Sequence, residues 1–333
     1  MELLYGAGFA SGKEIYVFFA KFGIYGIVGA IISAILTGNI IYKTIKIVKK
    51  YNIESNNKFI DEVSKSKNNK IQKINKKFLK STINIFLVIS FFIMMAGFSS
   101  YFKQRFNIPI IVSSLIMTII LYITFLNNIE GIMKINEVVI PILLIILTYL
   151  IVKTPINMQT NLIKVEPISQ LFQAIVMAII YASYNSVLLI PIIISANKYM
   201  KSNKEIKKIA IFITIIIIAL SIGMMNIIWN SDIDIESVDL PIIKILERNE
   251  IEENLYSLVL IIAIFTSAVS AGYGFLENIK NRRTYKKIAI LMCLAGIVIA
   301  HIGFGKLVEF LYPLFGLIGV FQIILIEREY KKI

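Results

Sequence analysis

The chain has 333 residues, of which 57% are hydrophobic, and its mean hydropathy is +0.76. This much apolar surface excludes an ordinary soluble domain and favours a membrane protein over a large soluble all-α core. The net charge is +14, but the basic residues lie mostly between apolar runs, which indicates membrane topology rather than nucleic-acid binding. Cys293 is the only cysteine, so an internal disulfide is excluded and a metal cluster is not expected.

The apolar runs are long enough to cross a bilayer as helices, which need about 20 residues each. The clearest run, Ile209 to Trp229, contains no charged residue. The sequence predicts an all-α polytopic membrane protein with ten spans. In chain order these are Met1–Phe22, Gly23–Ile47, Thr82–Phe102, Ile108–Leu126, Gly131–Val152, Ser169–Ala196, Ile206–Trp229, Leu255–Leu276, Lys287–Phe304 and Lys306–Ile326.

The charges of the loops test this count. Three loops, after spans two, six and eight, are basic: Lys43–Lys80, Lys198–Lys208 and Glu277–Lys287. The loop after span seven, Asn230–Glu253, has eight acidic residues against two basic ones. Basic loops stay cytoplasmic, so a multi-pass protein of the cell membrane with both termini inside is expected. Lys103 and Arg105 are a minor exception to this rule, since they follow span three and fall on the outer side of the membrane in this count.

The loop at 43–80 is polar, with a weak amphipathic pattern at Ile71, Ile74 and Phe78. It is interpreted as a solvated, partly helical cytoplasmic loop. Contact with anionic lipid headgroups is the alternative.

The first span carries a cluster of small residues that weakens its helix. Three glycines fall within seven residues, and Ser11 and Glu14 have the spacing of a capping box. We expect one helix to stop near Gly6–Gly8 and another to start near Ser11, with free N–H groups suited to a carboxylate. Close packing of small residues is the alternative. The candidate substrate-binding residues are Gly6, Ala7, Gly8, Ala10, Ser11 and Gly12.

The sixth span contains a second polar cluster, followed by Pro191. Proline removes a backbone donor and clashes with the preceding turn, so we expect a break near Val187. Ser183, Tyr184 and Asn185 are therefore the second set of candidate substrate-binding residues. Polar side chains that only bond a neighbouring helix are the alternative.

The two expected breaks lie in spans one and six of ten. This arrangement predicts a single transporter domain at 1–333, built from an inverted five-plus-five repeat at 1–152 and 166–327. The prediction rests on position alone, since the halves share no convincing residue-level repeat.

The segment Gly6–Glu14, followed by Phe18 and Phe19, resembles the opening of bacterial YkvI-like membrane proteins. The resemblance extends over nearly the whole chain. This family is regarded as a group of amino-acid permeases within the amino acid–polyamine–organocation superfamily. It implies a LeuT-like fold and transport of a small-molecule solute.

In sodium-coupled relatives of that fold, a sodium ion sits between helix one and a Thr-Ser pair on helix eight. By this resemblance Tyr5, Ala263, Thr266 and Ser267 are candidate Na⁺ ligands. Hydroxyl groups that bond carbonyls of their own helix are the alternative. Proton-coupled relatives have a lysine in the middle of helix five. Here Lys134 lies only at the start of that span, which favours sodium.

Only Met1–Tyr5 precede Gly6, about 7.5 Å of helix. Family members have a longer stretch there, so helix one is expected to be truncated or the start to lie upstream. No HExxH or paired Asp-rich motif is present, and only His301 and Glu309 suit acid–base work, so no enzyme and no organic cofactor are expected. A sodium-coupled importer is the first hypothesis, and a ligand sensor that does not move solute is the second. Substrate identity and oligomeric state do not follow from the sequence.

Overall fold

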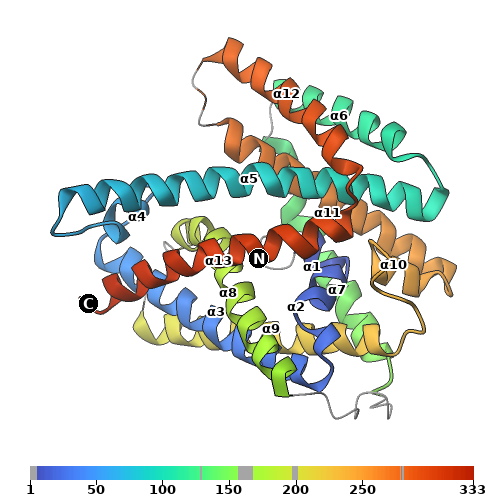
Figure 1. The fold of residues 1–333 in the computed structure, drawn as a ribbon, viewed down its shortest axis with the longest axis horizontal. Coiled ribbons are helices and arrows are strands. Elements are labelled where there is room, and N and C mark those ends of the chain that lie inside the picture. The colour runs from blue at the N-terminus through green and yellow to red at the C-terminus, as the bar shows by residue number, and fades with distance from the viewer. Residues whose placement is uncertain (1–5, 128–129, 157–167, 197–201, 278, 280) are drawn as a thin grey trace. The chain divides into compact units, whose positions relative to one another are not determined.

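The computed structural model describes residues 6–127, 130–156, 168–196, 202–277, 279 and 281–333, and these form helices joined by loops, with no strand among them. Figure 1 shows the helices in chain order. They are α1 (Ala7–Ala10), α2 (Lys13–Phe18), the short 3-10 helix η1 (Ala20–Phe22), α3 (Ile24–Lys50), α4 (Asn56–Val63), α5 (Asn69–Phe106), α6 (Ile110–Leu126), α7 (Glu130–Lys153), α8 (Ile168–Ala196), α9 (Asn203–Trp229), α10 (Pro241–Leu246), α11 (Glu250–Leu276), α12 (Arg282–Ala300) and α13 (Phe304–Tyr330).

Each of the nine spans expected after the first falls wholly or largely within one helix, so the all-helical prediction is confirmed for the described residues. Five of the described helices, α3, α5, α9, α11 and α13, are long and apolar enough to cross a membrane. The helix α6 and the Val138–Lys153 part of α7 are apolar but shorter. The protein is therefore a helical membrane protein, while the number of ten spans stays a prediction.

The chain folds into two compact units, each made of three separate segments. Unit 1 comprises Met1–Val17, Asn84–Asn157 and Asn226–Leu311. Unit 2 comprises Phe18–Ile83, Met158–Met225 and Tyr312–Ile333. Both units take residues from both halves of the chain. The repeats expected at 1–152 and 166–327 divide the chain differently and stay a prediction.

In unit 1, α6 packs against α12 and α7 against α11, and Figure 1 shows α6 and α12 side by side. The hydroxyl of Thr118 donates to the carbonyl of Cys293 at 3.2 Å, which ties α6 to α12. Gly272 of α11 lies against the Phe125 ring, and a Cβ there would come within 2.5 Å of it. Small residues let these helices approach closely, as is common in membrane proteins.

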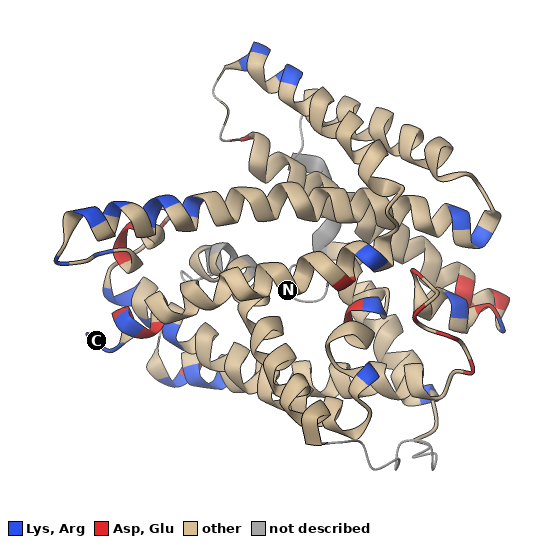
Figure 2. Ribbon diagram, viewed as in Figure 1, with Lys and Arg blue, Asp and Glu red and all other residues tan. Residues whose placement is uncertain are grey.

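Contacts between helix ends in unit 1 agree with an alternating order of spans. Arg105, at the end of α5, pairs with Glu253, at the start of α11, at 3.2 Å. Lys153, at the end of α7, pairs with Glu252. Figure 2 shows acidic positions, in red, along the segment before α10 and at the start of α11. Arg105 is an exception to the loop-charge rule. Its charge is compensated by Glu253, which the same span count places on the same side of the membrane.

In unit 2, α3 packs along α8, and a Cβ at Gly29 would lie 3.0 Å from the carbonyl oxygen of Ala174. The helix α13 also approaches α8 through small residues, since a Cβ at Gly319 would lie 2.6 Å from the carbonyl of Ser183. The two helices can therefore keep this separation only with glycine at that position.

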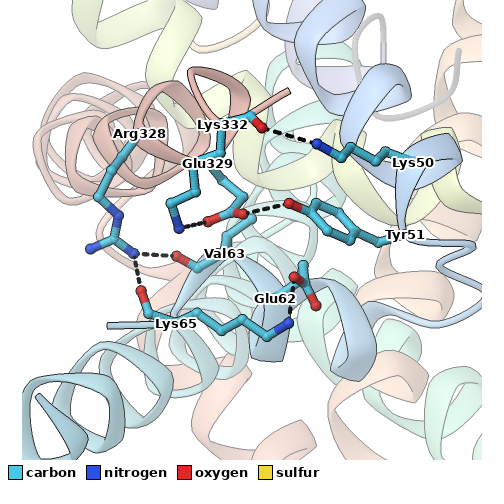
Figure 3. A network of polar contacts seen from close by, with 8 residues as sticks. All are labelled: Lys50, Tyr51, Glu62, Val63, Lys65, Arg328, Glu329 and Lys332. Carbon is cyan, nitrogen blue, oxygen red and sulfur yellow. Dashed lines mark hydrogen bonds and ion pairs between the residues drawn. The ribbon is translucent and has the colours of Figure 1, made fainter. Parts of the chain in front are cut away.

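One end of unit 2 is basic and holds the C-terminus (Figures 2 and 3). Arg328 donates to the carbonyls of Val63 and Lys65, at 2.8 and 2.7 Å, and so caps the end of α4. Tyr51 donates to Glu329 at 2.9 Å. The C-terminus therefore lies beside the basic loop at 43–80, which agrees with the even number of spans predicted between them. That this side is cytoplasmic stays a prediction.

The basic loop is more ordered than expected. Its residues 56–63 form α4, whose apolar face (Phe59, Ile60 and Val63) is buried in a cluster with Ile47 and Ile326. The amphipathic pattern at its end belongs to the first turns of α5, where Ile71, Ile74 and Phe78 are exposed.

Candidate functional site

The helical segment expected as the first span is interrupted, but later than predicted. The helix α1 ends at Ala10 and α2 begins at Lys13, so the break lies at Ser11 and Gly12 rather than between Gly6–Gly8 and Ser11. Gly12 has a φ of +85°, a conformation that favours glycine, and a Cβ there would lie 2.8 Å from Ile242. The earlier glycines do not interrupt the helix: Gly6 precedes α1, and Gly8 lies within its single turn.

Ser11 stabilises the break through a local turn. Its hydroxyl donates to the carbonyl of Gly8 at 2.6 Å and accepts from the backbone N–H of Lys13 at 3.1 Å. The side chain of Ser11 thus caps the start of α2 as expected. It accepts from the backbone N–H two residues later in the chain, whereas a capping box uses the N–H three residues later. Gly6 precedes α1 as its N-cap, and Ala7, Gly8 and Ala10 are buried within it.

The backbone carbonyls at the break are held by neighbouring helices of unit 1. The N–H of Ile242, in α10, donates to the carbonyl of Ser11 at 3.1 Å. The hydroxyl of Tyr256, a fully buried side chain of α11, donates to the carbonyl of Ala10. Buried backbone groups that lose their helical partners need such replacements. The interruption is therefore stabilised by hydrogen bonds from α10 and α11.

Directly after the break, Lys13 is 3% exposed and its ammonium is fully used. It donates to the carbonyls of Ile235, Glu236 and Val238 at 2.9, 2.8 and 3.0 Å. An ammonium has three donors and no acceptor, so these three bonds satisfy it. We call Lys13 and the segment Ile235–Asp239 the Lys13 clamp.

Asp239 connects the clamp to two further helices. Its carboxylate accepts from the hydroxyl of Ser100, in α5, at 2.6 Å and from the N–H of Gly305, in α13, at 2.7 Å. Next to it, Gln104 exchanges two hydrogen bonds with the backbone of Leu240, at 3.1 and 3.2 Å. The acidic segment that was expected to be an external loop is thus anchored to the broken helix.

These partners of Lys13 were not predicted from the sequence. The signal that could have singled out Lys13 is its position, since an ionisable residue inside an apolar span needs a partner. Its acceptors are backbone carbonyls, which carry no residue signature, and so they could not be read from the sequence.

The second expected break is absent, and that prediction is wrong. The helix α8 runs without interruption from Ile168 to Ala196. The hydroxyl of Ser183 donates to the backbone carbonyl of Ile179 at 2.7 Å. The side-chain amide of Asn185 donates to the backbone carbonyl of Tyr181 at 2.9 Å. Because these side chains bond carbonyls of their own helix, they give the backbone no reason to open.

Asn185 nevertheless keeps one unused group. Its side chain is 1% exposed, and its Oδ1 is buried without a hydrogen-bond partner among the described residues. Close to it in the chain, Tyr184 stacks on Phe18 and on Tyr312, with ring centroids 5.7 and 5.0 Å apart. Tyr181 adds an edge contact to Phe18 at 4.9 Å. Unit 2 thus combines an orphaned acceptor with a cluster of aromatic rings.

Of the expected sodium ligands, Ala263, Thr266 and Ser267 lie on α11, and Tyr5 lies outside the described residues. The hydroxyl of Thr266 donates to the carbonyls of Ile262 and Ala263, at 2.9 and 3.2 Å. Its proton is therefore used within the helix, while its oxygen keeps lone pairs for a cation. These donors fit Na⁺ chemically, and the sodium site stays a prediction.

The predicted substrate residues fall in different units. Gly6, Ala7, Gly8, Ala10, Ser11 and Gly12 belong to unit 1, whereas Ser183, Tyr184 and Asn185 belong to unit 2. Their joint role stays a prediction. His301, the residue considered for proton relay, ends α12 and is exposed, with its Nδ1 2.8 Å from the carbonyl of Ile297.

Comparison with known proteins gives two similar chains, both from Bacillus subtilis (strain 168). The uncharacterized membrane protein YkvI is 23% identical over 326 residues, which cover 95% of this chain and 89% of YkvI. The uncharacterized protein YyaD is 24% identical over 329 residues, or 96% and 92% of the two chains. No family model matches the chain. The expected resemblance to YkvI-like membrane proteins is thus supported over nearly the full length.

Proposed function

We propose that the protein is a secondary transporter of a small solute, and that this solute is an amino acid or a similar zwitterion. The observation that carries the proposal is the interruption of the first helix at Ser11 and Gly12, with its carbonyls anchored by Ile242 and Tyr256. Irregular backbone at membrane depth is tolerated where it is buried or lines a cavity, and in secondary transporters it forms substrate sites. The free N–H groups expected at the break are absent from Ala10, Ser11 and Gly12, which donate to the carbonyls of Gly6, Ala7 and Phe9. A substrate carboxylate at the break would therefore have to compete with these carbonyls for the N–H groups.

The orphaned Oδ1 of Asn185 supports the same substrate class. An acceptor that is buried without a partner costs free energy unless a ligand satisfies it. The ammonium of an amino acid is a suitable donor, and the rings of Tyr184 and Tyr181 would favour a cation nearby. We therefore propose that Ser183, Tyr184 and Asn185 contribute to substrate binding without a helix break.

The division of the chain into two compact units supports alternating access. Many secondary transporters work by the movement of one helical bundle as a rigid body. Here each unit is compact and takes segments from both halves of the chain. This organisation, together with the YkvI-like sequence, supports the finer proposal of a LeuT-like fold within the amino acid–polyamine–organocation superfamily.

We propose Na⁺ as the coupling ion. The proposal rests on Thr266 and Ser267 of α11, whose hydroxyl oxygens and the carbonyl of Ala263 are hard ligands of the kind that bind alkali cations. A proton-coupled mechanism would need an ionisable group in the middle of α7, and the only ionisable side chain in the described stretch from Val138 to Val152 is that of Tyr149.

The experiment is uptake of labelled amino acids into proteoliposomes under a sodium gradient, a proton gradient or neither. Uptake of at least one amino acid that requires the sodium gradient is expected. Ser267→Ala should lower the dependence on sodium, and Ser270→Ala, a matched change three residues along α11, should not. Uptake driven by the proton gradient alone would contradict sodium coupling, and no uptake of any amino acid would contradict the proposed substrate class.

The unbroken α8 favours a second candidate, a ligand sensor that binds without transport. A transporter with only one interrupted helix has one fewer point at which its spans can bend. A sensor would show saturable amino-acid binding, measured by the melting temperature of the purified protein, without accumulation in proteoliposomes. Binding with accumulation identifies the transporter.

A further inference from the structure

A groove of about 500 Å³ lies between α3 and α9 in unit 2, outside the candidate substrate residues. The helix α3 contributes its middle and α9 its first half. Nine residues line the groove: Ile35, Gly38, Asn39, Tyr42, Lys207, Ala210, Ile211, Thr214 and Ile215. They include one cation and no anion.

The groove exists because both helices carry small residues where they meet. A Cβ at Gly38 would clash with the hydroxyl of Thr214 and lie 3.3 Å from the carbonyl of Ala210. The helices therefore touch at this level. Beside this contact the nine lining side chains leave a groove between the two helices.

The apolar end of the groove faces outward. The side chains of Ile35, Ile211 and Ile215 are 55%, 50% and 59% exposed. Both helices are long and apolar enough to cross a membrane. Half-exposed isoleucines on such helices are suited to contact with hydrocarbon rather than water.

The other end of the groove is basic. Lys207 is exposed there, and Lys46 of α3 donates to Asn203 of α9 at 2.7 Å, with its ammonium 5.7 Å from the centre of the Tyr42 ring. Lys204 and Lys208 flank this end and are also exposed. The positive charge lies at the basic end of unit 2, the side expected to be cytoplasmic.

We propose that this groove binds an anionic phospholipid. One acyl chain would lie along the isoleucine end, and the phosphate would lie at Lys207, with Tyr42 and Asn39 as hydrogen-bonding partners. Basic pockets between membrane helices on the cytoplasmic side recognise lipid headgroups in this way. The inference does not rest on the proposed transport function, since it uses only the surface of α3 and α9.

The test is native mass spectrometry of the purified protein with phosphatidylglycerol and with phosphatidylcholine of the same acyl chains. Preferential retention of phosphatidylglycerol is expected. Lys207→Gln should weaken its retention about fivefold, as one lysine near an anionic headgroup contributes about 1 kcal/mol. Lys208→Gln is the matched control, because it removes the same charge from the next residue, which does not line the groove.

A second variant tests the acyl-chain end independently of charge. Ile211→Trp adds bulk at an exposed lining position of the isoleucine end and should reduce retention of phosphatidylglycerol at unchanged melting temperature. Equal retention of both lipids, or equal effects of Lys207→Gln and Lys208→Gln, would overturn the proposal and indicate non-specific lipid contact.

Discussion

The side-chain ammonium of Lys13 donates a hydrogen bond of 2.8 Å to the backbone carbonyl of Glu236. The two residues are far apart in the sequence, and this bond is one of three that hold the segment before α10 against the broken first helix. The clamp therefore couples the position of α2 to that of the acidic segment.

Replacing Lys13 tests the clamp. Lys13→Ala leaves three carbonyls without their donor and Asp239 without the nearby positive charge, so we expect a loss of about 3 kcal/mol in unfolding free energy. The measurement is the melting temperature in detergent, together with the rate at which a cysteine placed at Ser237 reacts with a thiol reagent. The matched control is Lys21→Ala, which removes an exposed lysine. Equal melting temperatures for the two variants would show that the clamp does not stabilise the protein.

Gly12 should resist substitution more than a helical glycine whose surroundings leave room for a Cβ. Gly12→Ala combines a positive φ with a Cβ 2.8 Å from Ile242, so we expect a destabilisation of about 1–3 kcal/mol. Gly274→Ala is the control, because a Cβ at this helical glycine would meet only Leu87, at an ordinary contact distance of 3.5 Å. Alanine there is expected to be neutral or slightly stabilising. Comparable stability of both variants would mean that the backbone at the break adapts without strain.

The helix positions could be predicted from the sequence because run length and charge determine where a membrane helix ends. The helix α6, for example, occupies Ile110–Leu126 against the expected Ile108–Leu126. The first break was predicted about two residues early, because three glycines lie in this segment and the sequence does not tell which of them adopts the positive φ. The break expected in α8 was wrong because Ser183 and Asn185 bond their own helix. Whether such side chains turn inward or outward depends on packing, which local sequence does not encode.

The contact between Tyr51 and Glu329 predicts a dependence on alkaline pH. The hydrogen bond to the Glu329 carboxylate raises the pKa of Tyr51 above its ordinary value of 10.0, with smaller contributions from partial burial and nearby charge. The neutral phenol is thus favoured in the folded state. Its contribution to stability is complete below the ordinary pKa and is lost as pH rises through the folded value.

Ultraviolet absorbance of the phenolate measures this titration, and Tyr51→Phe identifies which step belongs to Tyr51. In Glu329→Gln the step should move to lower pH, toward the ordinary tyrosine value, because the acceptor loses its charge. A step at the same pH in the wild type and in Glu329→Gln would show that the carboxylate does not act on Tyr51.

Replacing Asn185 distinguishes a structural role of its side chain from a role in substrate binding. If its buried Oδ1 has no function, Asn185→Leu removes an unsatisfied polar atom and should leave stability unchanged or raise it by about 1 kcal/mol. If the oxygen accepts from the substrate, the same variant should bind amino acid at least about tenfold more weakly, the equivalent of about 1.4 kcal/mol. We expect both results together, namely a stable protein with weakened binding. The control is Ser186→Ala, since Ser186 donates to the carbonyl of Ser183 at 2.7 Å and has no orphaned atom. Binding as strong in Asn185→Leu as in the wild type would exclude Asn185 from the site, because the substituted side chain has no group that can accept a hydrogen bond.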